Sequence, residues 1–246
     1  MPGVKTYQRY GRELEETLRL QTTPIAVKMI ATEGEVPAGA LRPSREGRHY
    51  AQCQAFALSR REGQTVAMFK EDHWCPGPAM AYGQVPFPEN RAASQMNAYA
   101  RFPYGKYAAI LSAPLTETAF EPDVVLVYAS TDQLRTMLLT LKEEERPKVK
   151  TNVFPFSCAY GVTDAIINNE YWVNLPDPGE RVRALALPGE MILSIPRRKL
   201  PGFMKGLKAF FKESRYAREQ MFMQPDFPQP DFYKTAFKNW GLPQGD

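Results

Sequence analysis

The spacing of apolar residues along the chain alternates between a helical period and short, mostly β-branched runs. In 131–145, leucine and methionine recur at the i, i+3, i+4, i+7 spacing of one helix face. Such spacing predicts helices over 6–20, 53–63, 91–101, 131–145, 158–169 and 200–221, with a last amphipathic segment at 231–241. Apolar runs bounded by turn residues predict strands over 24–30, 65–69, 108–115, 124–130, 182–187 and 190–196.

These elements predict an α/β fold, with α+β as the alternative, in which helices pack on a mixed β-sheet. The order strand, cysteine-headed helix, strand occurs at 24–69 and again at 124–195, which suggests a degenerate internal duplication. We expect a single α/β domain over 1–198 that carries the three cysteines, followed by a helical C-terminal arm over 199–246.

The composition is that of a globular protein: of 246 residues, 43% are hydrophobic and 24% are charged. No apolar run approaches the ~20 residues that cross a bilayer, and the charged N-terminus resembles neither a signal peptide nor a transit peptide. We therefore expect a cytoplasmic protein. Because thiols stay reduced in that compartment, the cysteines are not expected to form disulfides.

The net charge of +4 is unevenly spread along the chain. Residues 197–218 hold eight Lys or Arg side chains against one acid, Glu213, so the rest of the chain is slightly acidic. The helix predicted at 200–221 is basic and amphipathic, which suits either docking on the body of the protein or contact with a partner or a membrane surface. Since the positive charge is confined to this helix, we do not expect nucleic-acid binding.

The candidate chemistry gathers at the cysteines. Within KEDHWCPGPAMAYG (70–83), His73 and Trp74 precede Cys75, which stands before Pro-Gly-Pro at a predicted helix start. Cys53 and Cys158 each head a predicted helix in the same way. Because free backbone amides and the positive dipole end favour a thiolate at such positions, each cysteine is a candidate ligand or reactive thiol.

Four interpretations of the cysteines stay open. They could be small buried hydrophobes, or three ligands of an iron–sulfur cluster that leaves one iron open. They could bind zinc together with His73 or His49, or Cys75 could be a catalytic thiol with His73 as its base. The cysteines lie far apart in sequence, so any shared site requires that the fold bring them together.

Three glycines near the cysteines, Gly77, Gly83 and Gly161, could form an anion-binding nest or could serve ordinary turns. No G-x-G-x-x-G or phosphate-loop motif occurs, which argues against a dinucleotide or nucleoside triphosphate enzyme. With two histidines in the chain, a site built from several histidines is excluded.

The chain resembles the domain of unknown function 169 family over about residues 8–196. The resemblance rests on PIAVKMI, CQAFALSRREG, the Cys-Pro-Gly-Pro-Ala stretch and FSCAYG, in which the matching residues are Cys53, Cys75, Gly77, Gly83 and Cys158. It implies a shared fold unit and an archaeal or anaerobic setting, but it implies no reaction. An anaerobic setting favours an oxygen-sensitive cluster.

The resulting hypothesis is an iron–sulfur protein of the 4Fe–4S type, with Cys53, Cys75 and Cys158 as metal ligands. His73 and the three glycines, Gly77, Gly83 and Gly161, are the further candidate cofactor-binding residues. The open iron would serve redox or small-ligand chemistry, with a small molecule or an electron-transfer protein as partner and a homo-oligomer as one assembly. The alternative is a non-catalytic binding module with a cysteine-lined pocket, and the residues do not decide whether the protein is an enzyme.

Overall fold

The computed structural model describes residues 2–88, 100–141, 149–152, 156–213 and 231–242. The chain divides into two compact units, Met1–Lys212 and Glu213–Asp246. In the second unit the described residues form one amphipathic helix, α9 (Asp231–Asn239). The candidate site lies in the first unit.

Within the described residues, a seven-stranded mixed sheet forms the middle layer of the first unit. The strand order is β2-β3-β1-β4-β7-β6-β5, and every pair is antiparallel except β5 with β6. The strands are β1 (Ile25–Ile30), β2 (Val66–Phe69), β3 (Ala109–Pro114), β4 (Val124–Ser130), β5 (Lys150–Asn152), β6 (Trp172–Asn174) and β7 (Glu190–Pro196).

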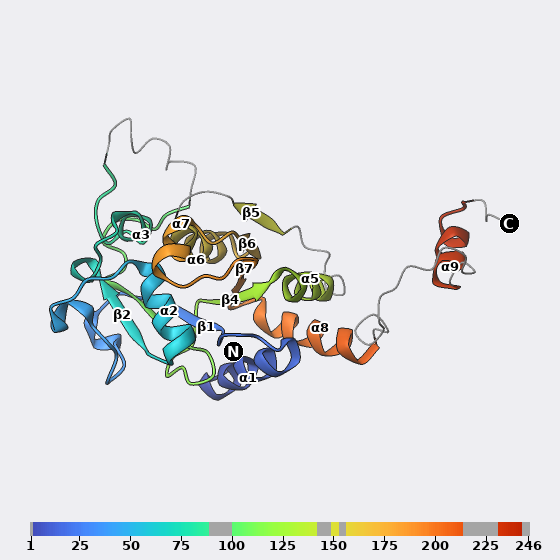
Figure 1. The fold of residues 1–246 in the computed structure, drawn as a ribbon, viewed down its shortest axis with the longest axis horizontal. Helices are drawn as coiled ribbons and strands as arrows, with labels where there is room; N and C mark the ends of the chain where they lie inside the picture. Colours follow the sequence, from blue (N-terminus) through green and yellow to red (C-terminus); the bar gives the residue numbers. More distant parts are fainter. Residues whose placement is uncertain (1, 89–99, 142–148, 153–155, 214–230, 243–246) are drawn as a thin grey trace. The chain divides into compact units, whose positions relative to one another are not determined.

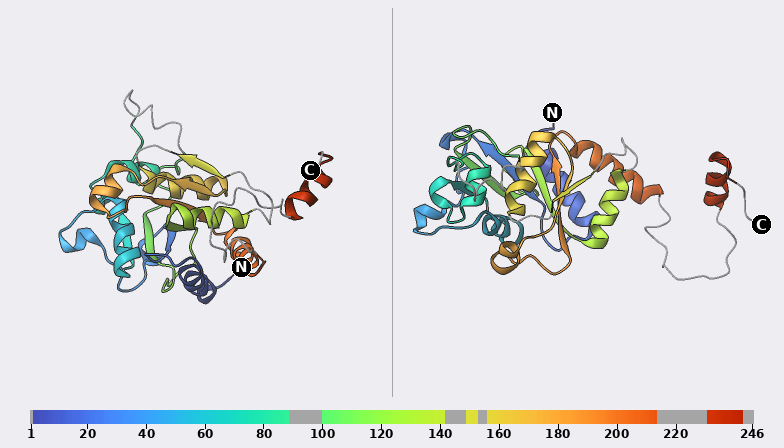
Figure 2. Two further views of the ribbon diagram at one scale, coloured as in Figure 1. Left: turned by 45° about the vertical axis from the view of Figure 1, so that its right-hand side comes forward. Right: turned by 90° about the horizontal axis from the view of Figure 1, so that it is seen from above.

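Helices cover both faces of this sheet (Figures 1 and 2). One face packs against α1 (Val4–Leu18), α5 (Thr131–Thr140) and α8 (Leu200–Glu213). The other packs against α2 (Gln52–Glu62), α3 (Pro76–Ala81), α6 (Ser157–Asn168) and α7 (Pro178–Arg183). Short 3₁₀ turns, η1 (Glu33–Glu35), η2 (Pro43–Glu46) and η3 (Lys70–Asp72), lie in the connections.

The sandwiched sheet explains the apolar runs in the sequence. Successive side chains of a strand point to opposite faces, so in β1 Ala26 packs into the core under α1 while Val27 packs into the core under α2. Strands buried on both faces have no polar side to alternate with. The α/β class expected from the sequence is therefore confirmed, whereas the internal duplication stays a prediction.

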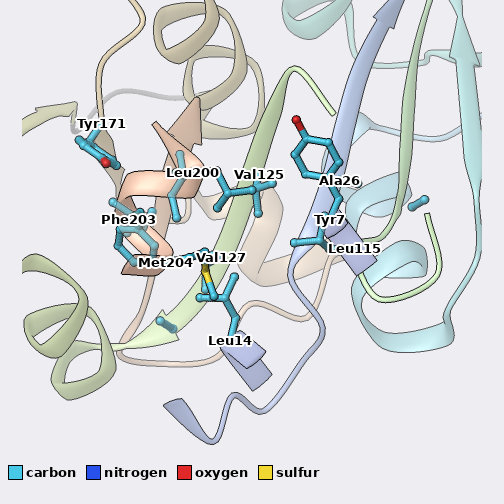
Figure 3. Close-up of a cluster of buried hydrophobic side chains, with 14 of the residues drawn as sticks. Tyr7, Leu14, Ala26, Leu115, Val125, Val127, Tyr171, Leu200, Phe203 and Met204 are labelled. Atoms are coloured by element: carbon cyan, nitrogen blue, oxygen red, sulfur yellow. The ribbon is translucent and has the colours of Figure 1, made fainter. Parts of the chain in front are cut away.

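Helix α8 docks on the body of the first unit. Its side chains Leu200, Phe203 and Met204 are buried in the core with Leu14 and Val127 (Figure 3). Leu207 is buried in the same core. A Cβ on Gly206 would lie 2.8 Å from the carbonyl oxygen of Thr140, so the glycine lets α8 approach the end of α5. Lys205, Lys208 and Lys212 remain exposed, and Lys208 Nζ lies 3.0 Å from Glu13 Oε1.

Most elements expected from apolar spacing are present, but the strand predicted at 182–187 is wrong. Asp177 caps a helix there by accepting a hydrogen bond from the Glu180 N–H at 2.9 Å, and Pro178 fits its first turn. The helix α7 ends at Arg183, and Leu185 then takes a positive φ of 55° that ends any extended run. The helix expected at 91–101 lies almost wholly outside the described residues.

The strands β5 and β6 were not expected, because three-residue strands leave too short a pattern to recognise. No helix in the described part of the chain is long and apolar enough to cross a membrane.

Candidate three-cysteine site

All three cysteines line one cavity of about 270 Å³. Cys53 is the second residue of α2, Cys158 is the second residue of α6, and Cys75 is the residue that caps α3. Figure 1 shows α3, α6 and α7 gathered beside α2 on one side of the sheet. The residues that line the cavity are Ala51, Cys53, Trp74, Cys75, Pro78, Phe156, Cys158, Asp177, Pro178, Gly179 and Arg183.

Backbone pairing brings the Cys53 and Cys75 segments together. The Tyr50 N–H donates to the carbonyl of Asp72 at 2.9 Å, and the Trp74 N–H donates to the carbonyl of Tyr50 at 3.2 Å. This short parallel bridge runs directly into α2 on one strand and α3 on the other. The two helix starts, and with them two of the three sulfurs, are therefore held side by side.

The third sulfur is placed by contacts of α6. The buried hydroxyl of Tyr82, just after α3, donates to the carbonyl of Cys158 at 2.9 Å. The Phe156 N–H donates to Asp177 Oδ2 at 2.8 Å, which ties the start of α6 to the start of α7. The fold thus brings together cysteines that are 22 and 83 residues apart in sequence.

The thiols of Cys75 and Cys158 are not pre-activated as free nucleophiles. A hydrogen-bonding interaction with Cys53, together with burial, raises the pKa of Cys158 well above its ordinary value. Burial also raises the pKa of Cys75, although a hydrogen bond from the Gly77 backbone opposes this. Their placement at helix starts alone suggested lowered pKa values for these cysteines, but desolvation of Cys75, and the interaction with Cys53 together with desolvation at Cys158, outweigh the effect of the helix start. The arrangement therefore does not support Cys75 as a lone catalytic thiol.

His73 lies apart from the cavity lining, although it is only two residues from Cys75. Both ring nitrogens are buried, and the side chain of Gln84 interacts with the ring. Burial lowers the pKa of His73 to about 4, with Asp72 opposing in part, so the ring is neutral at pH 7. The ring packs 6.5 Å from that of Tyr82, centroid to centroid.

The glycine at 77 makes room for an aromatic ring at the cavity. A Cβ on Gly77 would lie 2.5 Å from ring carbons of Phe156. Phe156 itself has a positive φ of 71°, a rare conformation for a bulky residue. The hydrogen bond to Asp177 and the flat contact with Gly77 hold this strained residue in place.

The other two predicted glycines make close contacts elsewhere. Gly83 has a φ of 70°, and a Cβ on it would lie 2.4 Å from the carbonyl oxygen of Pro103. Gly161, inside α6, faces Asn174 and Ser194 of the sheet, whose side-chain atoms would be 2.8 and 3.1 Å from a Cβ. None of the three predicted glycines, Gly77, Gly83 and Gly161, is among the residues that line the cavity, and each makes a close packing contact.

A buried carboxyl group beside the cavity was missed by sequence reasoning. Glu180 is fully buried and accepts hydrogen bonds from Tyr128 Oη and Ser157 Oγ, both at 2.6 Å. Burial raises the pKa of Glu180 to about 7. The available signal was the sequence Asp-Pro-Gly-Glu, a helix start that carries its glutamate at the third position.

Within the described ranges, no set of three or more His, Cys, Asp or Glu side chains is arranged to hold a single metal ion. The cavity walls other than the cysteines are mainly apolar, with Asp177 and Arg183 as the charged exceptions. The possible ligand atoms that line the cavity are three sulfurs and the Asp177 carboxylate, without a histidine.

Comparison with known proteins gives the family. The profile of the DUF169 family, described as uncharacterised ArCR, matches residues 13–206. The chain belongs to this family. The uncharacterized protein MJ0308 of Methanocaldococcus jannaschii is 24% identical over 227 residues, which cover 84% of this chain and 96% of that protein. No solved structure shows significant similarity to the chain. The DUF169 match spans all three cysteines and every element that lines the cavity.

Proposed function

We propose that this DUF169 protein holds an iron–sulfur cluster, of the 4Fe–4S type, in the three-cysteine cavity. Cys53, Cys75 and Cys158 would be the iron ligands, and one iron would lack a protein ligand. The observation that carries the proposal is that the three cysteines of the chain, each at a different helix start, line one cavity.

The chemistry of the cavity fits a cluster better than a mononuclear ion. Thiolates are the usual ligands of iron–sulfur clusters, whereas structural zinc sites take four cysteine or histidine ligands. His73, the nearest histidine in sequence, does not line the cavity. A cluster is wider than one ion, so its ligands need not meet at a single point, and the apolar walls would shield it from water.

The raised thiol pKa values indicate how binding would couple to protons. A cluster requires thiolates, and a bound metal deprotonates its cysteine ligands. Because Cys75 and Cys158 are protonated at neutral pH, loading would release their protons. The hydrogen bond from Gly77 to Cys75 would then stabilise a charged sulfur.

Once bound, the cluster would supply redox or Lewis-acid chemistry at its open iron. The chain's own residues would exclude water and fix the ligands: Tyr82 holds the Cys158 backbone, and Phe156 closes one wall over Gly77. We place the protein in the cytoplasm of an anaerobe, where thiols stay reduced and a cluster survives. A small molecule or an electron-transfer protein would be its partner, and a homo-oligomer is one assembly that fits this role.

The test replaces each cysteine with serine in the full chain, prepared without oxygen. Cys75→Ser should reduce cluster retention, seen as loss of visible absorption, while far-ultraviolet circular dichroism stays unchanged. Ala57→Ser, on the same helix as Cys53, is the matched control and should keep the absorption of the parent. Serine variants that retain the full absorption of the parent would overturn the assignment of ligands.

A metal-free binding module is the second candidate, and the mainly apolar lining of the cavity favours it. In this function the cavity takes a small organic molecule between Trp74 and Phe156, and the cysteines serve as polarizable walls. A folded chain that binds no iron after anaerobic reconstitution would favour this module over the cluster.

A further inference from the structure

The exposed rim of the three-cysteine cavity carries one aromatic side chain and one cation. Trp74 is 47% exposed, and Arg183 is exposed at the last position of α7. The guanidinium carbon of Arg183 lies 5.0 Å from the centre of the Trp74 ring, in cation–π contact. Trp74 is held from the other side, because its indole N–H donates to Gln54 Oε1 at 3.1 Å.

The two charged groups of the cavity are used differently. Asp177 accepts hydrogen bonds from the backbone N–H groups of Phe156 and Glu180, one on each carboxylate oxygen, at 2.8 and 2.9 Å. Arg183 has no ion pair with any carboxylate among the described residues. Arg183 nevertheless faces the cavity, because it is one of the residues that line it.

We infer that the cavity binds a small aromatic carboxylate, whose carboxylate pairs with Arg183 and whose ring packs against Trp74. A guanidinium presents donors in a planar fork that matches a carboxylate, and stacking on an indole pre-orients that fork. Among the remaining lining residues, Pro78, Phe156 and Pro178 are apolar, and the Asp177 carboxylate is occupied by the two backbone hydrogen bonds described above. A volume of about 270 Å³ restricts the occupant to a small molecule.

This inference deepens the proposed function, because the anion would sit at the rim while the buried sulfurs of Cys53 and Cys158 hold the cluster below it. It does not require the cluster, however, since the Trp74–Arg183 pair is formed by the protein alone. The two proposals can therefore fail separately.

The test is isothermal titration calorimetry of the anaerobically prepared full chain with benzoate, benzamide and benzylammonium. Benzoate should bind, and the neutral and cationic analogues should bind at least about tenfold more weakly, as expected for loss of a charge-assisted hydrogen bond. Arg183→Gln should weaken benzoate binding by a similar factor, and Arg183→Lys by less. Arg181→Gln, exposed on the same helix, is the matched control and should bind benzoate like the parent.

Each outcome decides one of the two proposals. Equal binding of benzoate and benzamide, no binding of benzoate, or benzoate binding that survives Arg183→Gln would overturn the anion site. The iron content of Arg183→Gln, measured on the same sample, should equal that of the parent. Arg183-dependent benzoate binding to a folded chain that takes up no iron on anaerobic reconstitution would retain the anion site and overturn the cluster.

Discussion

The phenol of Tyr128 donates a hydrogen bond to the buried carboxyl of Glu180 across 2.6 Å. The other carboxyl oxygen is bonded to Ser157, the residue before Cys158, so one acid links the sheet, α6 and α7. The guanidinium of Arg60 stacks on the ring of Tyr128, with its carbon 4.0 Å from the ring centre. The network fixes the start of α6, and therefore the position of a cysteine.

This acid predicts a pH dependence of stability. Burial raises the pKa of Glu180 from its ordinary 4.5 to about 7, so the folded chain binds a proton there that the unfolded chain releases. The contribution to the free energy of unfolding is complete below about pH 4.5 and is lost as the pH rises to about 7. Its size is roughly 3 kcal/mol, from 1.4 kcal/mol per pKa unit.

Glu180→Gln mimics the protonated acid, so the free energy of unfolding of this variant should no longer fall as the pH rises to about 7. Relative to the parent, the variant should gain up to roughly 3 kcal/mol in free energy of unfolding between pH 5 and pH 8 in urea denaturation. The lowered pKa of His73 acts in the opposite direction between about pH 4 and 6.5, but it is common to both proteins and cancels in the difference. A difference that does not change with pH would contradict the account of Glu180.

The close contact between Gly77 and Phe156 predicts that a larger residue at position 77 disrupts packing, which a role in an anion-binding nest alone would not. Gly77→Ala places a methyl group 2.5 Å from ring carbons of Phe156, so this ring, which stands at the start of α6, must shift. We expect a loss of about 1–3 kcal/mol in free energy of unfolding, typical of overpacking. Gly3→Ala, with nothing within 4 Å of the added Cβ, is the control and should stay within about 0.5 kcal/mol. Thermal unfolding at a parental midpoint for Gly77→Ala would refute the packing role.

A buried ion pair supports the far end of α2. Arg60 Nη1 lies 3.1 Å from Glu190 Oε1, and both side chains are almost completely buried. Glu190→Gln leaves a buried guanidinium without its carboxylate, which should cost about 3–5 kcal/mol in chemical denaturation. Glu46→Gln disrupts an exposed pair with Arg48 and should cost at most about 1 kcal/mol. Similar losses in free energy of unfolding for Glu190→Gln and Glu46→Gln would show that burial does not strengthen the Arg60–Glu190 pair.

Helix α8 should behave as part of the core. Leu207→Ala removes a fully packed side chain and should lower the free energy of unfolding by about 2–5 kcal/mol. Lys205→Ala, exposed on the same helix, should change it by less than about 0.5 kcal/mol. A negligible effect of Leu207→Ala would mean that the helix is detachable and serves another surface.

Much of the fold could be predicted from apolar spacing. The helices α1, α2, α5 and α6 and the strands β1, β3, β4 and β7 are long enough for their periods to stand out. The run VRALAL looked like a strand because apolar alternation cannot reveal that Asp177 caps a helix whose last residues are the first two of this run. The turn residues Asp177 and Pro178 set the structure of this segment. The carbonyls of Ala184 and Leu185 also accept hydrogen bonds from Arg60, which lies 124 residues away from Ala184.

The placement of the cysteines at helix starts was predictable, because Pro and Gly punctuate the sequence after Cys75 and the other two head apolar periods. The rim was not predictable. Arg183 approaches Trp74 because it lies on α7, a helix that the apolar pattern did not reveal. Glu180 is an acidic residue that is fully buried, and the sequence does not show that burial. Both depend on contacts between segments about 50 to 110 residues apart, which local patterns do not report.

The most direct test of the account is the iron and acid-labile sulfide content of the full chain after anaerobic reconstitution with ferrous iron and sulfide. A 4Fe–4S cluster in the three-cysteine cavity should give about four of each per folded chain, with stoichiometric loss in the variant that replaces both Cys53 and Cys158 with serine. A folded parent chain that takes up neither iron nor sulfide, or a double variant that takes up as much as the parent, would contradict it.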